Sequence, residues 1–384
     1  MHKLLGCYLG LSISFGFVAS VNGYGPTGHQ IVGQIADERL ANTPTGNRVR
    51  ELLQGVDLEK AAVIPDEIKG WDKNGPDDPK AFHYSRHPQI DAQLCDFWHA
   101  NPPTRDQNSP TPSHHWFHYT DVPVVRSEKY EDGAAGRSKW DVVHMISYCV
   151  DVLRGHIPEQ NDRKITKPIA IILLAHYVGD IHQPLHVGAE YFGKSGSVAD
   201  PDKDKTALAD EGGNTLTIEL NDDPPPSRGI HKRKFHGFWD MDSPNALLPD
   251  VPEQTEKEER RAILWSAQAK VAHEMASQEP ANWKEPADLD VSRYGQAWAN
   301  EILPIAREAH ERLVFKNVAP LAEEDRVVAT GEVEEKAGTP PGDYRKWAVG
   351  IVRKELHKAG WRLADILEKS LAAEKSTPAV SPSP

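Results

Sequence analysis

The amino-acid sequence predicts a mainly α fold with long loops and a minor β component. Apolar side chains recur at the three- and four-residue spacing of one helix face in six segments. Alternation of apolar and polar residues, which is typical of a strand, is convincing in one segment, 214–220. The 30 prolines and 28 glycines, many of them gathered between the helical segments, indicate long connecting loops.

The expected helices occupy residues 29–40, 137–154, 166–181, 258–277, 294–315 and 342–370. The segment 166–181 has the clearest boundaries, because Thr166 can cap its first turn and Pro184 prevents its continuation. The expected loops are rich in Pro, Asp, Ser and Gly and cover residues 86–113, 193–213 and 221–229. Residues 371–384 have the polar, proline-rich composition of a disordered tail.

Residues 1–23 have the features of a secretory signal peptide. A basic residue precedes an apolar stretch, and Val21 and Gly23 supply the small residues of a cleavage site. The sequence therefore predicts a secreted or periplasmic protein with no membrane span, since no later apolar run is long enough to cross a bilayer. Removal of the signal leaves two cysteines, Cys95 and Cys149, which have the option of forming one disulfide.

The charge balance argues against a cationic surface that holds nucleic acid through its phosphates, because the formal net charge is −13. The unusual feature of the composition is its 18 histidines. Imidazole is the commonest metal ligand, so bound metal ions are a possible source of positive charge for an anionic substrate.

One histidine lies within the most apolar of the expected helices. His176 and Asp180 are four residues apart and therefore share one helix face among Ile, Leu and Val. A buried imidazole and carboxylate need partners, which are either each other, as a hydrogen-bonded core pair, or a cation. His186 follows directly after the helix break at Pro184, where the chain can turn back to the same place. The three side chains together favour a metal site.

A second pair with the same spacing, His236 and Asp240, follows later in the chain. On its own this spacing is a weak signal, because 18 histidines produce it by chance and Asp240 could instead cap a helix. Asp66 and His118 are further single candidates.

Several short blocks occur in a characteristic order. The most specific is His176-x-x-x-Asp180-x-x-Gln183-Pro184-Leu185-His186. The supporting blocks are Tyr24-Gly25-x-x-Gly28-His29, Trp116-Phe117-His118-Tyr119-Thr120-Asp121, Gly212-Gly213-Asn214, His236-x-x-Trp239-Asp240, Trp298-Ala299-x-Glu301 and Ala359-Gly360-Trp361-Arg362-Leu363-Ala364. In this order they resemble the trinuclear-zinc nuclease family, which includes fungal single-strand-specific nucleases, plant bifunctional nucleases and, more distantly, bacterial zinc phospholipase C. The resemblance runs from Tyr24 to about Leu367 and implies a single zinc-nuclease domain over residues 24–370 with the helical fold of that family and a minor β-hairpin.

The resemblance implies three zinc ions, whose ligands would be Tyr24, His29, Asp66, His118, His176, Asp180, His186, His236 and Asp240. One ion would be held by Asp66, His118, His176 and Asp180, and a second by His186, His236 and Asp240. The third would be held by Tyr24 and His29, with Asp180 bridging it to the first. Tyr24 would bind through its main-chain amino group and carbonyl, which requires cleavage after Gly23. The family usually has Trp here, and main-chain ligation tolerates the change.

The implied catalytic residues are Asp66, Lys69 and Asp180. Zinc lowers the pKa of bound water to about 7, and such a water would attack phosphorus while Lys69 neutralises the developing charge. Tyr119 and Asp121 would bind an unpaired base, the first by stacking. From the residues alone, Lys69 is equally well an ordinary surface residue, and Tyr119 and Asp121 a core aromatic and a turn residue.

The activity that the resemblance implies is that of a secreted zinc-dependent endonuclease with no stable protein partner. It would cleave single-stranded DNA or RNA to 5′-phosphate products and would also act on 3′-nucleotides. The alternative is a zinc phospholipase C-like phosphodiesterase acting on phospholipid headgroups; Asp240, where those relatives have Glu, favours the nuclease, as do Tyr119 and Asp121. A third interpretation is a non-catalytic secreted metal-binding protein whose cleft is covered by loops 86–113 and 193–213. The complete ligand set argues against it.

Overall fold

The computed structural model describes residues 24–104, 109–223, 233–252, 254–323 and 326–372. The expected signal peptide, 1–23, and nearly all of the expected tail, 371–384, lie outside the described residues. So does most of the expected loop 221–229.

The centre of the molecule is α7 (Lys167–Asp180), which is buried along its whole length from Ile169 onwards. Its first turn is capped as expected, because the side chain of Thr166 accepts a hydrogen bond from the Ile169 N–H. Three helices pack around it, namely α1 (Pro26–Leu40), α6 (Val142–Leu153) and α12 (Asp343–Leu371). Because α7 is enclosed by other elements, a polar group on it cannot reach water and must find its partner in the interior.

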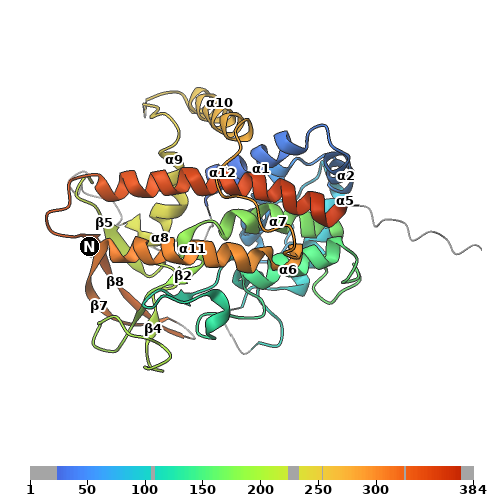
Figure 1. The fold of residues 1–384 in the computed structure, drawn as a ribbon. Helices are drawn as coiled ribbons and strands as arrows, with labels where there is room; N and C mark the ends of the chain where they lie inside the picture. Colours follow the sequence, from blue (N-terminus) through green and yellow to red (C-terminus); the bar gives the residue numbers. More distant parts are fainter. Residues whose placement is uncertain (1–23, 105–108, 224–232, 253, 324–325, 373–384) are drawn as a thin grey trace, which may run out of the picture.

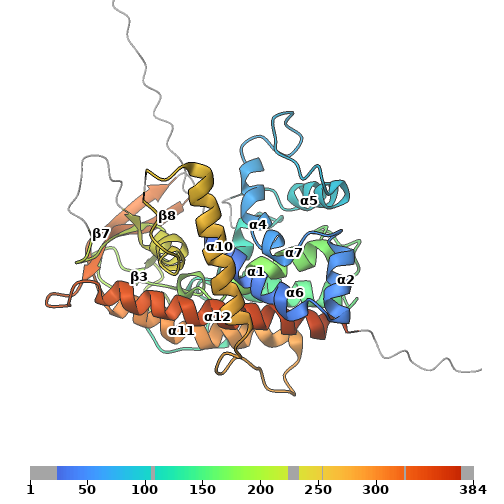
Figure 2. The ribbon, with the colours of Figure 1, turned by 90° about the horizontal axis from the view of Figure 1, so that it is seen from above.

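Two further long helices complete this bundle. α11 (Tyr294–Glu311) packs against α6 and runs beside α12 across the molecule, as Figure 1 shows. α10 (Lys257–Ala276) packs on α1 and α12 from the outside and crosses them (Figure 2). The mainly α fold expected from the sequence is confirmed.

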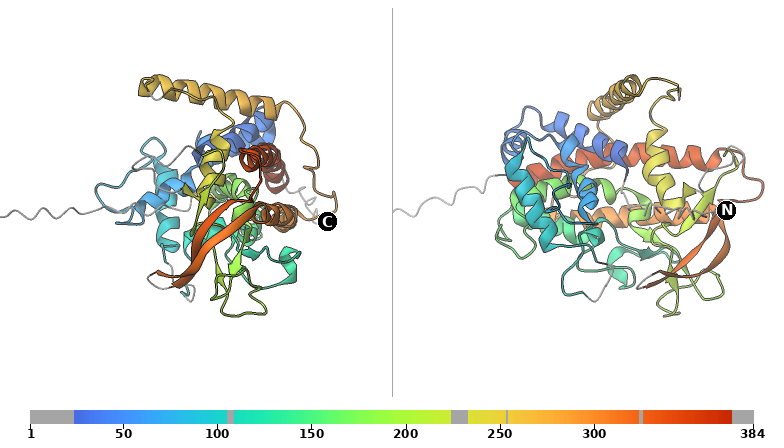
Figure 3. Two further views of the ribbon diagram at one scale, coloured as in Figure 1. Left: turned by 90° about the vertical axis from the view of Figure 1, so that its left-hand side faces the viewer. Right: turned by 180° about the vertical axis from the view of Figure 1, so that it is seen from behind.

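The β structure is gathered at one end of the bundle. A four-stranded sheet has the order β6 (Arg233–Lys234), β5 (Leu216–Glu219), β8 (Arg326–Glu335) and β7 (Leu313–Glu323). β5 and β8 are parallel, and the other two pairs are antiparallel. The expected minor β-hairpin is present as β7 and β8, whose long ribbon is clear in the left view of Figure 3.

Two small two-stranded sheets accompany it. β1 (Val122–Pro123) pairs in parallel with β2 (Gly188–Ala189), and β3 (Tyr191–Phe192) pairs antiparallel with β4 (Leu208–Ala209). The remaining elements are short connectors: α2 (Pro44–Leu52), α3 (Leu58–Ala61), α4 (Ile64–Glu67), η1 (Ile68–Trp71), α5 (Pro88–Ala100), η2 (His114–His118), η3 (Tyr130–Asp132), η4 (Pro184–His186), α8 (Phe235–Gly237), η5 (Phe238–Asp242), α9 (Ser243–Asn245) and η6 (Val291–Arg293).

The expected loop 86–113 is wrong in its first half, which forms α5. Pro88 occupies the first turn, where a missing N–H costs nothing, and does not break the helix. Ile90, Leu94 and Phe97 recur at helical spacing and are all buried. The composition of the segment, rich in Pro, Asp and Ser, concealed this pattern.

The expected helix 294–315 also extends too far. α11 ends at Glu311, and Leu313 already begins β7. β8 is rich in charged residues, and it is fixed by pairing with β5, more than a hundred positions earlier in the chain. Such long-range pairing leaves little trace in local sequence.

Among the helices of the described residues, none is long and apolar enough to cross a membrane. Cys95, on α5, and Cys149, buried in α6, are free thiols, so the disulfide considered from the sequence is not formed.

Candidate metal centre

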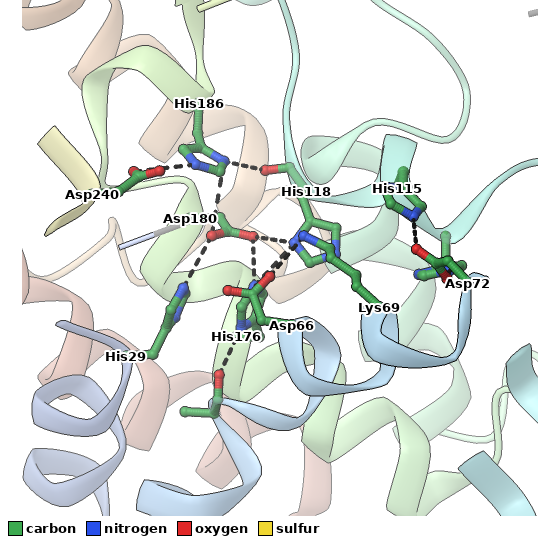
Figure 4. Close-up of polar contacts among 12 residues, drawn as sticks. His29, Asp66, Lys69, Asp72, His115, His118, His176, Asp180, His186 and Asp240 are labelled. Atoms are coloured by element: carbon green, nitrogen blue, oxygen red, sulfur yellow. Dashed lines mark hydrogen bonds and ion pairs between the residues drawn. The ribbon is translucent and has the colours of Figure 1, made fainter. Parts of the chain in front are cut away.

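Side chains from seven elements meet at the C-terminal end of α7 (Figure 4). α7 itself provides His176 and Asp180, and η4, which follows it, provides His186. The other contributing side chains are His29 from α1, Asp66 from α4, His118 from η2, His236 from α8 and Asp240 from η5. The helix break at Pro184 turns the chain back to the same place, as the sequence suggested.

A first cluster consists of Asp66, His118 and His176. His118 Nδ1 is 3.0 Å from His176 Nε2 and 3.0 Å from Asp180 Oδ2. His176 Nε2 is also 3.7 Å from Asp66 Oδ1 and 3.3 Å from Asp180 Oδ2. These atoms are close enough to bind one ion together, because ligand atoms about 2 Å from a tetrahedral zinc lie about 3.3 Å apart.

His29 forms a second cluster with His176 and Asp180. Its ring stacks on that of His176 with centroids 3.8 Å apart, and its Nε2 is 3.4 Å from Asp180 Oδ1. This approach depends on Gly179, because a Cβ there would lie 2.7 Å from His29 Nδ1. The carboxylate of Asp180 thus faces both clusters, one with each oxygen.

The third cluster is formed by His186, His236 and Asp240. His236 Nε2 is 3.1 Å from His186 Nε2 and 3.0 Å from Asp240 Oδ2. His236 lies in α8, and Asp240 lies in η5, the single turn of π-helix that continues from it. The two side chains therefore still lie on one face. Gln183 donates to Asp240 Oδ1 at 2.7 Å and orients this carboxylate.

Backbone carbonyls fix the tautomer of three of the imidazoles. The Nδ1 atoms of His176, His186 and His236 lie 2.6–2.8 Å from the carbonyl oxygens of Ala62, His118 and Gly212. A carbonyl can only accept, so each Nδ1 carries the proton and each Nε2 has a lone pair that faces the centre. This is the arrangement in which proteins hold histidines that bind metal ions.

The facing lone pairs provide a test of whether these residues fit a cation. His186 Nε2 and His236 Nε2 are 3.1 Å apart, so either a proton or a cation must lie between these two nitrogens. Both nitrogens of His29 and Asp180 Oδ1 are buried and make no hydrogen bond to any described residue. A shared cation would satisfy all of these atoms at once, so the residues fit a metal centre.

The electrostatics of the site also favour a cation. Burial lowers the pKa of His186, but the carboxylates of Asp180 and Asp240 outweigh it and raise the pKa to about 9. Burial alone would raise the pKa of Asp66, whereas Lys69 and the nearby imidazoles hold it well below its usual range. The buried carboxylates therefore favour positive charge on the neighbouring imidazoles, in the form of bound protons. Metal ions can take the place of these protons.

Tyr24 lies against this centre. It is fully buried, and the N–H of the next residue, Gly25, donates to the Asp240 carbonyl at 2.7 Å. Its hydroxyl donates to the His182 carbonyl at 2.8 Å.

Two of the sequence blocks without an assigned role meet behind Tyr24. Arg362, which is almost completely buried, donates to His182 Nε2 at 2.9 Å and to Glu301 Oε2 at 2.5 Å. The ring of His182 in turn donates to the Val178 carbonyl on α7. This buried network anchors the end of α7 and was not recognised as a functional support from the sequence.

The expected substrate residues lie at the edge of the centre. Lys69 is no ordinary surface lysine, because its side chain is buried and its Nζ is 2.7 Å from Asp66 Oδ1. Tyr119 and Asp121, which follow His118, are half-buried. Burial and the charge of Asp210 raise the pKa of Asp121 to about 7, against the opposing positive charges of His186 and Arg326. Arg326, at the start of β8, was not predicted as a neighbour of this site.

Two further groups of side chains with metal-ligand geometry were not predicted. One consists of Asp72, His114 and His115, and the other of His83, Asp91 and Cys95. In each group two members share one element, His114 with His115 in η2 and Asp91 with Cys95 on α5, and the third comes from another part of the chain.

Comparison with known proteins agrees with this geometry. The model of the family described as S1/P1 Nuclease matches residues 24–372. The chain is similar to three proteins of Arabidopsis thaliana, each 24% identical to it: Endonuclease 4, over 68% of this chain and 74% of the relative; Endonuclease 5, over 67% and 71%; and Endonuclease 1, over 59% and 55%. The chain thus spans between about half and three quarters of the length of these relatives. It belongs to the S1/P1 nuclease family and is a hydrolase of phosphodiester bonds.

Proposed function

We propose that this protein is a secreted, zinc-dependent endonuclease that cleaves single-stranded DNA or RNA to 5′-phosphate products and also hydrolyses 3′-nucleotides. The observation on which this rests is the convergence of buried imidazole lone pairs and carboxylates at the end of α7, in a chain of the S1/P1 nuclease family. The net charge of −13 agrees with it only if bound ions provide the positive charge for a polyanion.

Three zinc ions would be held by the three clusters. Asp66, His118 and His176 would hold one with Asp180, and His186, His236 and Asp240 would hold another. His29 and the main chain of Tyr24 would hold the third, with Asp180 as the shared ligand. Zinc bound in this way would lower the pKa of a water molecule to about 7 and polarise the phosphoryl group.

The chain's own residues would orient the substrate. Lys69 holds Asp66 in place and puts a positive charge beside the centre, where negative charge develops during phosphoryl transfer. The ring of Tyr119 would stack on a base, which is worth about 1–3 kcal/mol and requires that the base be unpaired. Asp121 would hydrogen-bond to the edge of that base.

Secretion and maturation belong to the same proposal. The main-chain amino group of Tyr24 is free to bind a metal ion only when residues 1–23 have been removed. The hydrogen bond from the Gly25 N–H to the Asp240 carbonyl keeps the preceding residue, Tyr24, close to the centre, which supports the proposed ligation. Activity would then depend on cleavage after Gly23.

The test is a side-by-side assay of the protein beginning at Tyr24. The substrates are single-stranded DNA, single-stranded RNA, duplex DNA, a 3′-nucleotide and phosphatidylcholine, each with metal-free and zinc-restored enzyme. We expect zinc-dependent cleavage of both single strands and the 3′-nucleotide, with 5′-phosphate ends. Faster hydrolysis of phosphatidylcholine would instead establish the phospholipase alternative, and full activity without metal would refute the proposal.

Two variants test whether the reaction takes place at the candidate metal centre. His236→Ala is expected to lose more than the 10–100-fold in activity that removal of an outer metal partner typically causes. The control is His144→Ala, because His144 forms a similar pair with Asp141 at 3.0 Å on a half-exposed helix end. Equal activities of the two variants would argue against the centre as the site of the reaction.

A further inference from the structure

A second group of metal-binding side chains lies next to the centre. Asp72, His114 and His115 each present a ligand atom within 4.8 Å of the others. His114 Nε2 is 3.1 Å from Asp72 Oδ1, and His115 Nε2 is 2.6 Å from Asp72 Oδ2. Each of the two imidazoles therefore approaches the Asp72 carboxylate with its Nε2 atom. Two histidines and one carboxylate make up the protein ligands of some zinc sites.

The elements that hold this group are those that also hold the centre. Asp72 directly follows η1, which continues from the helix of Asp66. His114 and His115 begin η2, the turn that ends in His118. Figure 4 shows the Asp72 and His115 pair beyond Lys69 as seen from Asp66. The backbone at both points is therefore as well fixed as that of the centre.

The carboxylate has an outer partner. The indole N–H of Trp98, on α5, donates to Asp72 Oδ1 at 3.1 Å. In the centre Gln183 does the same for Asp240, and metal-binding carboxylates are generally held by such donors. α5 thus helps to orient Asp72, whose other oxygen, Oδ2, faces His115.

Burial and charge suit a metal ion at this place. The ring of His114 is buried, and its Nδ1 makes no hydrogen bond to any described residue. The side chains of Asp72 and His115 are 22% and 33% exposed, which leaves room for water in the remaining coordination positions.

We propose that Asp72, His114 and His115 bind a further divalent transition-metal ion, of the zinc class, separate from the clusters at the end of α7. The proposal is independent of the catalytic function, because it concerns only the number of ions bound. The solvent-facing side of the group makes this ion more readily exchanged than those of the buried clusters.

The test compares zinc content in His115→Gln with that of the unaltered protein. The glutamine amide can still donate to Asp72, so a purely hydrogen-bonded group is preserved, whereas an amide is a poor zinc ligand. The proteins are stripped with chelator, equilibrated at buffered free zinc, and analysed for metal by mass spectrometry. We expect His115→Gln to bind one ion fewer per chain, and titration calorimetry to show the loss of the weakest class of site.

The matched control is His99→Gln, because His99 Nε2 pairs with Asp77 Oδ2 at 2.8 Å in an exposed two-residue pair. It should keep the full metal content. Asp72→Asn provides a second variant and should lose the same single ion. Equal zinc content in the unaltered protein and in both His115→Gln and Asp72→Asn would overturn the proposal, whatever the total number of ions or the activity.

Discussion

At the scale of single residues, the proposed chemistry would depend on side chains that are unfavourable in an ordinary core. Asp180 lies on a completely buried helix, with one carboxylate oxygen that accepts no hydrogen bond from the described residues. Such atoms cost about 1–3 kcal/mol each when nothing binds them. The same reasoning applies to buried carboxylates outside the centre, of which Glu190 is the clearest.

Glu190 links the stability of the protein to pH. It lies between β2 and β3, close to Asp210 and to His310, which is paired with Asp210 at 3.2 Å. Burial, and then the charge of Asp210, raise its pKa to about 7, although His310 opposes the rise. Since the unfolded chain ionises this group near pH 4.5, the folded state binds the extra proton between pH 4.5 and 7. The contribution of Glu190 to stability therefore falls as the pH rises through that window.

We expect Glu190→Gln to remove this penalty. Relative to the unaltered protein, its free energy of unfolding should increase between pH 5 and pH 8, by up to about 3 kcal/mol. Urea unfolding of the metal-free proteins at the two pH values measures it. Glu219→Gln, at an exposed position on β5, is the control and should give the same difference at both. A Glu190→Gln difference that does not change with pH would contradict the argument.

Some residues of the centre could be identified from the sequence and others could not, for a physical reason. His176 and Asp180 are neighbours because of helix geometry, so their spacing alone indicated a shared site. Asp66 and His118 come from other elements, and only the resemblance to a family placed them in the same set. Asp72 and His114 have neither local spacing nor a family block, so their proximity was found only in three dimensions.

At the scale of elements, the packing of α1 on α7 decides where His29 lies. Gly179 allows the contact, because a Cβ there would lie 2.7 Å from His29 Nδ1 and 3.0 Å from its Cε1. Alanine would favour the helix by about 0.5–1 kcal/mol, but overpacking costs about 1–3 kcal/mol. We therefore expect Gly179→Ala to be destabilising by about 1–2 kcal/mol and to weaken the zinc ion assigned to His29.

The control for this substitution is Gly350→Ala on α12. No atom lies within 4 Å of the Cβ that it would add, so only the helix preference remains. It should stabilise the protein by about 0.5–1 kcal/mol with unchanged metal content. Urea unfolding of the metal-free forms, together with zinc analysis, measures both effects. If Gly179→Ala were as stable as Gly350→Ala and kept all its zinc, the close packing of His29 would not matter.

The elements themselves were predictable where local pattern determines them. The long helices follow from apolar spacing, and the cap at Thr166 was located correctly. α5 was missed because its composition outweighed its pattern. A minor hairpin was expected from the family resemblance, but the residues of β7 and β8 were not located, because a strand defined by a partner far along the chain has no local signature. The part of the fold that surrounds the centre was therefore predicted better than the part at the hairpin end.

At the scale of the whole molecule, the centre joins segments that are far apart in the chain. The side chains grouped there extend from His29 to Asp240 and come from several separate elements of the chain. Metal ions bound there would therefore stabilise the folded state as a whole, since the unfolded chain cannot hold these residues together. Asp180 has the largest effect, because it faces two of the three clusters.

Removal of metal is thus expected to lower the melting temperature. An ion present at about 100 times its Kd contributes about 2.7 kcal/mol, and each kcal/mol corresponds to about 1.4 °C in a domain of about 350 residues, so chelation is expected to lower the melting temperature by about 4 °C for each ion removed. Asp180→Asn should bind at least two ions fewer and show a smaller shift, because it has less metal to lose. Scanning calorimetry with and without chelator, beside zinc analysis of the same samples, measures both. Loss of a single ion in Asp180→Asn would show that its carboxylate serves one site only, and identical melting temperatures with and without zinc would show that the centre does not hold the molecule together.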